Sequence, residues 1–152
     1  MGQRGIGFRH WMDWVADRVE SYVGIDIVNA LIARNAQLHA SQRRTFLCRD
    51  FTRDPLPRAD VILCRDALVH FSFADIRAAL RNFRRSGSRY LLTTTFIAHE
   101  RNDDIWTGGF RMLNLERAPL RFPPPLAPID ERRPLLNGSD SGKRLALWEL
   151  GS

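Results

Sequence analysis

Residues 60–66 read Asp-Val-Ile-Leu-Cys-Arg-Asp and residues 90–96 read Tyr-Leu-Leu-Thr-Thr-Thr-Phe, and these two stretches decide the fold class. Val61–Cys64 is an uninterrupted apolar run, which is typical of a strand that is covered on both faces. Residues 90–96 are β-branched and aromatic, which favours a second strand. The segment between the two strands then decides how they are connected.

This intervening segment carries the best-defined helix signal in the sequence. Ser72 and Asp75 have the spacing of a capping box, and Gly87 is a stop signal. Between these positions, apolar residues recur at helical spacing: Ile76, Ala79, Leu80 and Phe83. A strand, a helix and a strand in this order predict a parallel pair joined by a right-handed crossover.

The same alternation occurs earlier in the chain. Apolar residues at helical spacing predict a helix over residues 10–20, and residues 21–26 form a short strand that ends in Asp26. Asn29 can cap a second helix, which is followed by a strand over residues 45–48 and by Asp50. Repeated strand and helix units predict an α/β fold with a parallel sheet and helices on both faces.

Three carboxylates follow three of the predicted strands: Asp26, Asp50 and Asp66. In open parallel sheets, ligands bind at the edge where the carboxyl ends of the strands meet. We therefore expect a ligand site at this edge. Asp residues are also common in turns, so each of these positions allows a structural interpretation as well.

The last third of the chain has a different character. Periodicity fades over residues 98–128, and Pro119 with the prolines of residues 123–125 favours an extended path over the surface, which we interpret as a lid or strap. The turn-rich residues 137–142 lead into a terminal strand over residues 144–148. We expect that strand to pair antiparallel with residues 126–129.

The 152 residues suit one domain, because a second core has no room. The net charge of +6 could indicate a polyanionic partner, but the arginines are scattered and Lys143 is the single lysine of the sequence. A clustered basic patch and an aromatic RNA-binding signature are both missing, which argues against a basic nucleic-acid-binding module as the function.

The sequence also constrains the compartment. Its longest apolar runs are far below the ~20 residues that a membrane helix needs, and residues 1–9 have no apolar signal core. Cys48 and Cys64 lie inside predicted strands, so we expect them to be buried thiols in a reducing compartment and neither a disulfide nor a zinc site. The expected location is the cytoplasm, with no membrane partner.

Taken in order, these segments resemble the class I S-adenosylmethionine-dependent methyltransferases. The resemblance rests on residues 22–28, 60–72 and 88–96 and on the terminal Leu-Ala-Leu-Trp-Glu-Leu strand, and it extends from about Gly5 to Leu150. It implies a single domain over residues 1–152 with a Rossmann-like, mostly parallel sheet, flanking helices and an antiparallel C-terminal strand. S-adenosylmethionine is the cofactor that it implies.

Carried over by position, the resemblance assigns roles to residues after the strands. Asp26 would bind the ribose hydroxyls, and Asp50 would lie with Phe51 beside the adenine. Arg65 and Asp66 would line the methionine end of the cofactor. A surface ion pair between these last two residues is the alternative, worth only ~0–1 kcal/mol.

His70 follows the same segment and is the candidate catalytic residue. An imidazole titrates near neutral pH, so His70 could take a proton from a hydroxyl or amine acceptor. The alternative is a histidine that makes a structural hydrogen bond beside a helix. An acceptor that is already deprotonated needs no base, because alignment alone then supplies much of the rate.

The resemblance departs from the family at the N-terminus. Gly5 and Gly7 stand in the place of the glycine-rich cofactor loop, but Gln3 replaces its usual acidic residue and no apolar strand precedes it. The neighbouring strands could pair directly, a second copy of the chain could fill the gap, or the natural protein could begin earlier. We expect the chain without such a strand to bind the cofactor weakly or not at all, and a version extended by a strand to bind it.

The leading hypothesis from the sequence is methyl transfer from S-adenosylmethionine to a small-molecule or polymer acceptor. A non-catalytic remnant of the same fold, acting in assembly or without any activity, is the alternative that the N-terminal departure favours. The nucleic-acid-binding module is a third and weaker alternative.

Overall fold

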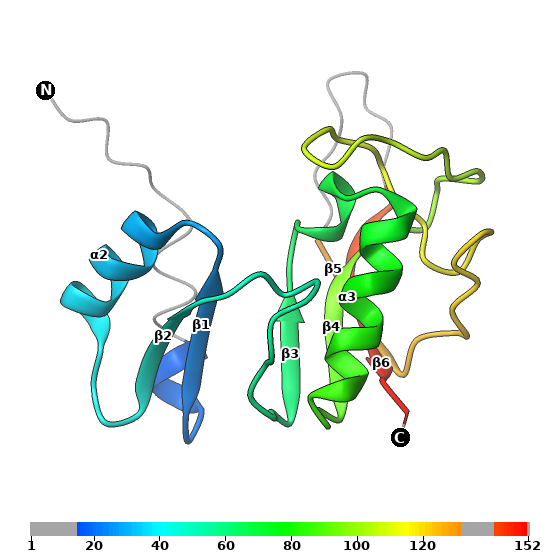
Figure 1. The fold of residues 1–152 in the computed structure, drawn as a ribbon. Coiled ribbons are helices and arrows are strands. Elements are labelled where there is room, and N and C mark those ends of the chain that lie inside the picture. The colour runs from blue at the N-terminus through cyan, green and yellow to red at the C-terminus, as the bar shows by residue number, and fades with distance from the viewer. Residues whose placement is uncertain (1–14, 132–141, 152) are drawn as a thin grey trace, which may run out of the picture. The chain divides into compact units, whose positions relative to one another are not determined.

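The computed structural model describes residues 15–131 and 142–151 (Figure 1). The chain divides into two compact units, residues 1–51 and residues 52–152, and each has a β-sheet of its own. The two units are described separately. In the part of the chain described, every helix is too short or too polar to span a bilayer.

The first unit is built on two parallel strands. β1 (Tyr22–Asp26) and β2 (Arg44–Cys48) pair in a register that places Asp26 opposite Cys48, and α2 (Asn29–His39) connects them. Residues 15–18 are helical, as the sequence predicts. Asn29 is the first residue of α2 and not its cap. Val28 is the N-cap residue, and it makes no side-chain capping bond because a valine side chain has no hydrogen-bonding atom. The Val28 amide donates to the Asp26 carboxylate.

The second unit has four strands in the order β3-β4-β6-β5. β3 (Val61–Cys64) and β4 (Tyr90–Phe96) are parallel, and the short 3-10 helix η1 (Leu68–His70) and α3 (Phe73–Arg85) lie between them in the chain. β6 (Lys143–Glu149) pairs antiparallel with β4 and with β5 (Ala127–Asp130). The α/β class with parallel strands and an antiparallel C-terminal strand is confirmed.

The signals at the two ends of α3 are also confirmed. The Ser72 hydroxyl accepts a hydrogen bond from the Asp75 amide at 3.2 Å, and Gly87 adopts a left-handed conformation with φ of 74° just beyond the helix. The apolar stripe expected from the sequence is buried: Ile76, Ala79, Leu80 and Phe83. This helix therefore forms where its own sequence predicts it.

The expectation that β3 is covered on both faces is wrong for its first residue. Val61 is 45% exposed, whereas Cys64 at the other end of the strand is buried. β3 is the end strand of its sheet, so it has a ladder partner on one side only. The expectation that both thiols are buried holds for Cys64 and is wrong for Cys48, which is only half-buried.

The segment from residue 97 to residue 126 is irregular, as expected, but it is not a strap confined to the surface. Leu113 and Leu115 are fully buried in the core of the second unit. A pair of buried asparagines supports this backbone: the Asn114 amide donates to the side-chain oxygen of Asn102 at 2.9 Å, and the Asn102 side chain donates to the Asn114 carbonyl at 2.7 Å. Buried backbone amides and carbonyls need hydrogen-bond partners, and in a helix or strand other backbone groups supply them. In this irregular segment the side-chain amide of Asn102 supplies them instead.

Candidate functional site

Asp26 lies at the carboxyl end of β1, in the first unit. One of its carboxylate oxygens, Oδ1, accepts a hydrogen bond from the Val28 amide at 2.8 Å, which fixes the side chain beside the turn that enters α2. The side chain is half-buried, and its other oxygen, Oδ2, has no protein partner among the residues described. Asp26 therefore has an anchored carboxylate with free hydrogen-bonding capacity.

The structure brings Asp50 and Phe51 to the same end of this small sheet. Cys48 lies opposite Asp26 in the ladder, and the Arg49 amide donates to the Asp26 carbonyl at 3.0 Å, which extends the pairing by one step. Asp50 and Phe51 follow directly and are both half-buried. The sequence prediction that acidic residues gather at one sheet edge holds for this unit. Gly5 and Gly7 lie outside the described residues.

Asp66 follows β3 in the second unit, and its carboxylate is already engaged. Lys143 Nζ lies 2.8 Å from Asp66 Oδ1, and Arg65 Nη1 lies 3.3 Å from Oδ2. The backbone at Asp66 is left-handed with φ of 52°, a conformation that Asp tolerates better than most residues, and its amide donates to the hydroxyl of Thr94 at 2.8 Å.

A second carboxylate completes this ionic cluster of Arg65, Asp66, Glu131 and Lys143. Arg65 Nε donates to Glu131 at 2.8 Å, and Lys143 lies 3.8 Å from the other oxygen of Glu131. Two cations thus face two carboxylates, so the cluster is neutral overall. The ion pair that the sequence allowed between Arg65 and Asp66 exists, but Glu131 and Lys143 were missed because they lie far away in the sequence.

His70 lies at the end of η1 and is exposed. Its Nδ1 lies 2.8 Å from the carbonyl oxygen of Gly109, and because a carbonyl only accepts, we assign the ring proton to Nδ1. The other ring nitrogen, Nε2, then carries a lone pair. The structural hydrogen bond that the sequence offered as an alternative is therefore present, and it engages Nδ1 of the exposed ring.

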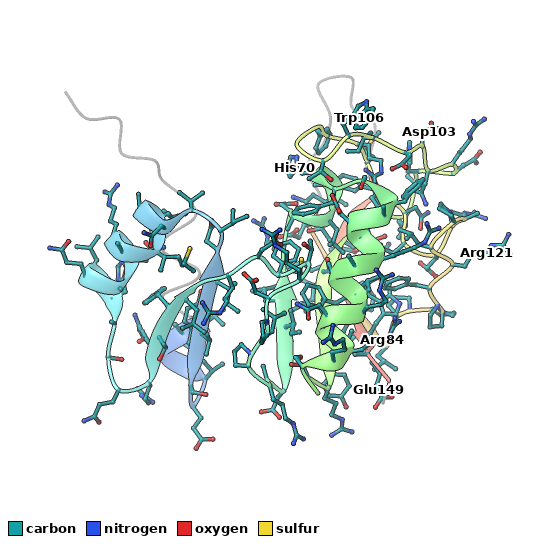
Figure 2. All side chains as sticks on the ribbon, viewed as in Figure 1. His70, Arg84, Asp103, Trp106, Arg121 and Glu149 are labelled. Atoms are coloured by element: carbon teal, nitrogen blue, oxygen red, sulfur yellow. The ribbon has the colours of Figure 1, made fainter. Side chains whose placement is uncertain are left out.

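The loop of residues 104–110 contacts His70 on one side. The Gly108 amide donates to the His70 carbonyl at 2.8 Å, and the Phe110 ring lies 5.6 Å from the imidazole. Trp106 is 91% exposed and Phe110 is 62% exposed. Figure 2 shows Trp106 and His70 near one end of α3. Sequence reasoning missed these aromatic residues, although two aromatics within the polar run Trp-Thr-Gly-Gly-Phe are a detectable signal.

This loop is fixed to the N-terminus of α3 by side chains. The Phe73 amide donates to Asp104 at 2.8 Å, the Ser72 amide donates to the Thr107 hydroxyl at 3.0 Å, and that hydroxyl in turn donates to Asp75. A carboxylate is favoured at a helix N-terminus, where the backbone amides point outward. The backbone that carries Trp106 and Phe110 is therefore anchored to the N-terminus of α3 by these hydrogen bonds.

Arg111 directly follows this loop, and its side chain is buried. It is 8% exposed, it donates to the Phe71 carbonyl at 2.7 Å, and its guanidinium lies 4.9 Å from the centre of the Phe73 ring. Burial lowers the pKa of Arg111, and the nearby charge of Asp104 partly offsets this effect. Within the described ranges, no group of three or more His, Cys, Asp or Glu side chains could hold a metal ion.

Comparisons with solved structures give the same architecture. LaPhzM superposes with a TM-score of 0.61 at 15% identity, covering 94% of this chain and 47% of that one. The N-methyltransferase NodS from Bradyrhizobium japonicum WM9 gives 0.57 at 12% identity, covering 91% and 78%. Magnesium protoporphyrin IX methyltransferase (ChlM) from Synechocystis PCC 6803, solved with bound SAM, gives 0.57 at 12% identity, covering 89% and 62%.

At these identities the likeness shows the fold alone, and this chain spans less than two thirds of the ChlM and LaPhzM chains. No curated protein matches the sequence. The family whose model describes the methyltransferase domain matches residues 4–87, which is more than half of the chain. The resemblance read from the sequence is thereby confirmed, and the chain belongs to the methyltransferase domain family.

Proposed function

We propose that this chain binds S-adenosylmethionine and transfers its methyl group to a small-molecule or polymer acceptor. The observation that carries the proposal is the family match over residues 4–87, because this range contains all the residues that the sequence suggested for the cofactor and for catalysis. These are Gly5, Gly7, Asp26, Asp50, Phe51, Arg65, Asp66 and His70.

The geometry of Asp26 fits the ribose of this cofactor. Ribose hydroxyls are donors, and an ionised carboxylate is an acceptor with two oxygens. The Val28 amide holds one oxygen and thereby orients the other, so little side-chain freedom is lost on binding. Asp50 and Phe51 follow the neighbouring strand at the same end of the sheet, where a polar group and a ring suit an adenine.

The ionic cluster limits the role that Asp66 can have in cofactor binding, because its side chain and its amide are already hydrogen-bonded. Its carboxylate already accepts from Lys143, and its backbone amide is bound to Thr94. We propose that Asp66 and Arg65 position the chain after β3 for the methionine end of the cofactor, with Lys143 as the positioning residue. Gly5 and Gly7 would let the backbone approach the same group, since a glycine has no Cβ.

When bound, S-adenosylmethionine supplies an electrophilic methyl group on a sulfonium centre. His70 would take the proton from an acceptor hydroxyl or amine at Nε2, while its Nδ1 keeps its own proton and donates it in a hydrogen bond to the Gly109 carbonyl. The exposed ring of Phe110 lies beside this histidine, and Trp106 is exposed on the same loop, so these rings offer a surface for the apolar part of an acceptor.

The location of the protein is part of the proposal. Both cysteines are free thiols, and free thiols persist in reducing compartments. We therefore propose a cytoplasmic enzyme.

The test of the proposed function is isothermal titration calorimetry with S-adenosylmethionine on the chain and on Asp26→Asn. A charge-assisted hydrogen bond contributes roughly 1.5–3 kcal/mol, so the variant should bind at least about tenfold more weakly. Asp103→Asn is the matched control, because Asp103 is an exposed carboxylate paired with Arg101 in the second unit. Its affinity should equal that of the unchanged chain.

Two outcomes would contradict the proposal in different ways. Equal affinities for the chain and for Asp26→Asn would remove Asp26 from the cofactor site. No measurable binding by the folded chain or by a version with an apolar strand grafted before Gln3 would favour the non-catalytic alternative, in which the methyltransferase fold is kept for assembly or has no activity.

A further inference from the structure

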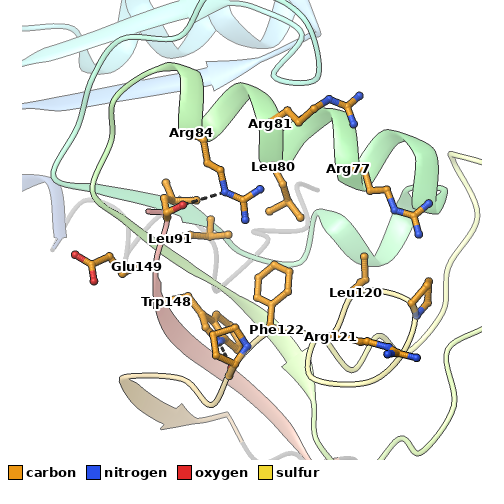
Figure 3. A pocket seen from close by; sticks show the side chains of 13 residues that line it. Arg77, Leu80, Arg81, Arg84, Leu91, Leu120, Arg121, Phe122, Trp148 and Glu149 are labelled. Atoms are coloured by element: carbon orange, nitrogen blue, oxygen red, sulfur yellow. Dashed lines mark hydrogen bonds between the residues drawn. The ribbon is translucent and has the colours of Figure 1, made fainter. Parts of the chain in front are cut away.

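A groove of about 350 Å³ lies in the second unit, away from the proposed methyl-transfer residues (Figure 3). It is bounded by α3, by residues 119–123 and by the end of β6. In the ladder, Trp148 lies opposite Leu91 near the start of β4, whereas Asp66 follows the opposite end of the parallel strand β3. Figure 2 likewise shows His70 at one end of α3 and Arg84 with Glu149 at the other.

The floor of the groove is apolar and well supported. Leu80, Leu91 and Trp148 are buried, with exposures between 0% and 5%. Phe122 packs edge-on against Trp148 with 5.3 Å between ring centres, and the Trp148 Nε1 proton is satisfied by the Pro123 carbonyl at 2.8 Å. These three buried side chains support the groove from behind, and a ligand would meet the half-buried side chains of Leu120 and Phe122.

The rim of the groove is cationic. Arg77, Arg81 and Arg84 stand on α3 at spacings of four and three residues, so they form one stripe along the helix, and Arg121 joins them from the segment opposite. The stripe is roughly 10 Å long, from the rise of ~1.5 Å per helical residue. The side chains are exposed, and Figure 3 shows them around the floor.

These arginines lack acidic partners within the described residues. Arg84 donates its Nε proton to the Leu150 carbonyl at 2.9 Å, which leaves its terminal nitrogens for another acceptor, and Arg77, Arg81 and Arg121 make no ion pair there. Glu149 is the one carboxylate in the lining, and it faces Arg89 at 3.9 Å. Four cations and one carboxylate therefore surround an apolar floor.

We propose that this groove is a second binding site, for a small organic anion that has an apolar body and a carboxylate or phosphate group. The volume is in the range of small-molecule pockets, at roughly 300–1,000 Å³. The apolar body would lie on Leu120 and Phe122, and the anionic group would face the arginines, whose planar guanidinium groups suit carboxylates and phosphates. The site is separate from methyl transfer and does not require the cofactor.

The test is isothermal titration calorimetry on the whole chain with four probes. 2-Naphthoate and 2-naphthyl phosphate carry the two kinds of anion on one body, 2-naphthamide removes the charge, and inorganic phosphate removes the body. Both naphthyl anions should bind at least about tenfold more tightly than the amide and than inorganic phosphate, and their affinity should fall with added salt. The stronger of the two shows which anionic group the arginines prefer.

The location of binding is tested with Arg81→Gln/Arg121→Gln and with Arg85→Gln as the matched control. Arg85 is an exposed arginine of the same helix that does not line the groove. The double variant should lose at least about fivefold in affinity for the preferred anion, and the control should lose nothing. These are surface substitutions, so circular dichroism should show unchanged folding.

Three results would overturn the proposal. Binding of the amide as tightly as the anions would show that the arginines do not recognise charge. An unchanged affinity in the folded double variant would place the site elsewhere. Absence of saturable binding of either naphthyl anion at millimolar concentration would show that the groove takes no such ligand.

Discussion

Gly24 stands in the middle of β1, where the ring of Phe46 on the neighbouring strand packs over it. A Cβ added at this position would lie 2.7 Å from the Phe46 Cδ1 atom and 3.3 Å from the Tyr22 ring. Tyr22 and Phe46 also contact each other edge-on, with 6.1 Å between ring centres. The ring therefore has little room to move away, and the glycine is required by packing.

We expect Gly24→Ala to lower the free energy of unfolding by about 1–3 kcal/mol, the usual cost of overpacking. The measurement is urea denaturation followed by circular dichroism. Val23→Thr is the control, because Val23 is 40% exposed and its replacement keeps the β-branched shape. Stability of the Gly24→Ala variant equal to that of the chain would mean that the ring of Phe46 turns aside freely.

Cys64 gives a prediction about pH. Burial raises the pKa of its thiol from 9.0 to about 12, against a smaller lowering effect of Thr93. Between these values the folded chain keeps the proton and the unfolded chain loses it. The unfolded state then binds fewer protons, so stability falls as the pH rises from 9 towards 12, by up to ~1.4 kcal/mol per pH unit.

The corresponding measurement compares urea denaturation of the chain and of Cys64→Ala between pH 8 and pH 10.5. Cys64→Ala should be less stable at neutral pH but should lose less stability as the pH rises, and Cys48→Ala is measured beside it as the removal of the other cysteine. Parallel slopes for all three proteins would show that the Cys64 thiol does not carry the effect.

At the scale of residues, the sequence predicted which side chains follow strands but not what they contact. Asp26 and Asp66 were expected at strand ends, and both are there. The partners of Asp66 and Arg65 could not be read, because Lys143 and Glu131 are brought near by the pairing of β5 with β6 and not by local spacing. Ionic contacts across a sheet have no period in the sequence.

At the scale of elements, the N-terminus of α3 and the loop of residues 104–110 form one hydrogen-bonded structure. The Thr107 hydroxyl accepts from the Ser72 amide and donates to Asp75, so it takes the place of the direct return bond of a capping box. The sequence predicted the Ser72 half of the cap, which is local. It did not predict the contribution of Thr107, which comes from a distant loop.

Thr107→Val removes this hydroxyl and keeps the shape of the side chain. We expect the variant to lose about 1–2 kcal/mol of stability, because two hydrogen bonds are lost at a helix N-terminus. Thermal unfolding measures the loss, and Thr107→Ser should restore most of it. If Thr107→Val were as stable as the chain, the loop would not be anchored through this residue.

Elements whose signals are local were predicted most closely. β3 and β4 coincide with the predicted strands, and α3 with the predicted helix, because each carries its own apolar pattern and stop signal. Residues 97–126 have no such pattern. Their backbone is supported by buried asparagine side chains, and contacts of this kind do not repeat at a regular spacing in the sequence. An interpretation as a surface strap was therefore natural and wrong for Leu113 and Leu115.

At the scale of the whole molecule, the two units differ in how much apolar surface they bury. In the second unit several large side chains are at most 1% exposed: Leu68, Val69, Ile76, Leu91, Leu113 and Leu115. In the described part of the first unit, the buried apolar side chains are Ala16 and Ile32, and its sheet has two strands. A single domain over residues 1–152 stays a prediction, and cooperativity between the units is its test.

Native-state hydrogen exchange measures that cooperativity directly. Two-stranded sheets with little buried surface are marginally stable, so the amides of β1, β2 and α2 should exchange through openings of lower free energy than those of α3, β4 and β6. In the second unit the slowest amides should report the global free energy of unfolding, because they lie in its core. Addition of S-adenosylmethionine should raise protection in the first unit if Asp26 binds the ribose, and this rise should be absent in Asp26→Asn. Equal protection of both units without cofactor would contradict the ranking and would establish one cooperative domain.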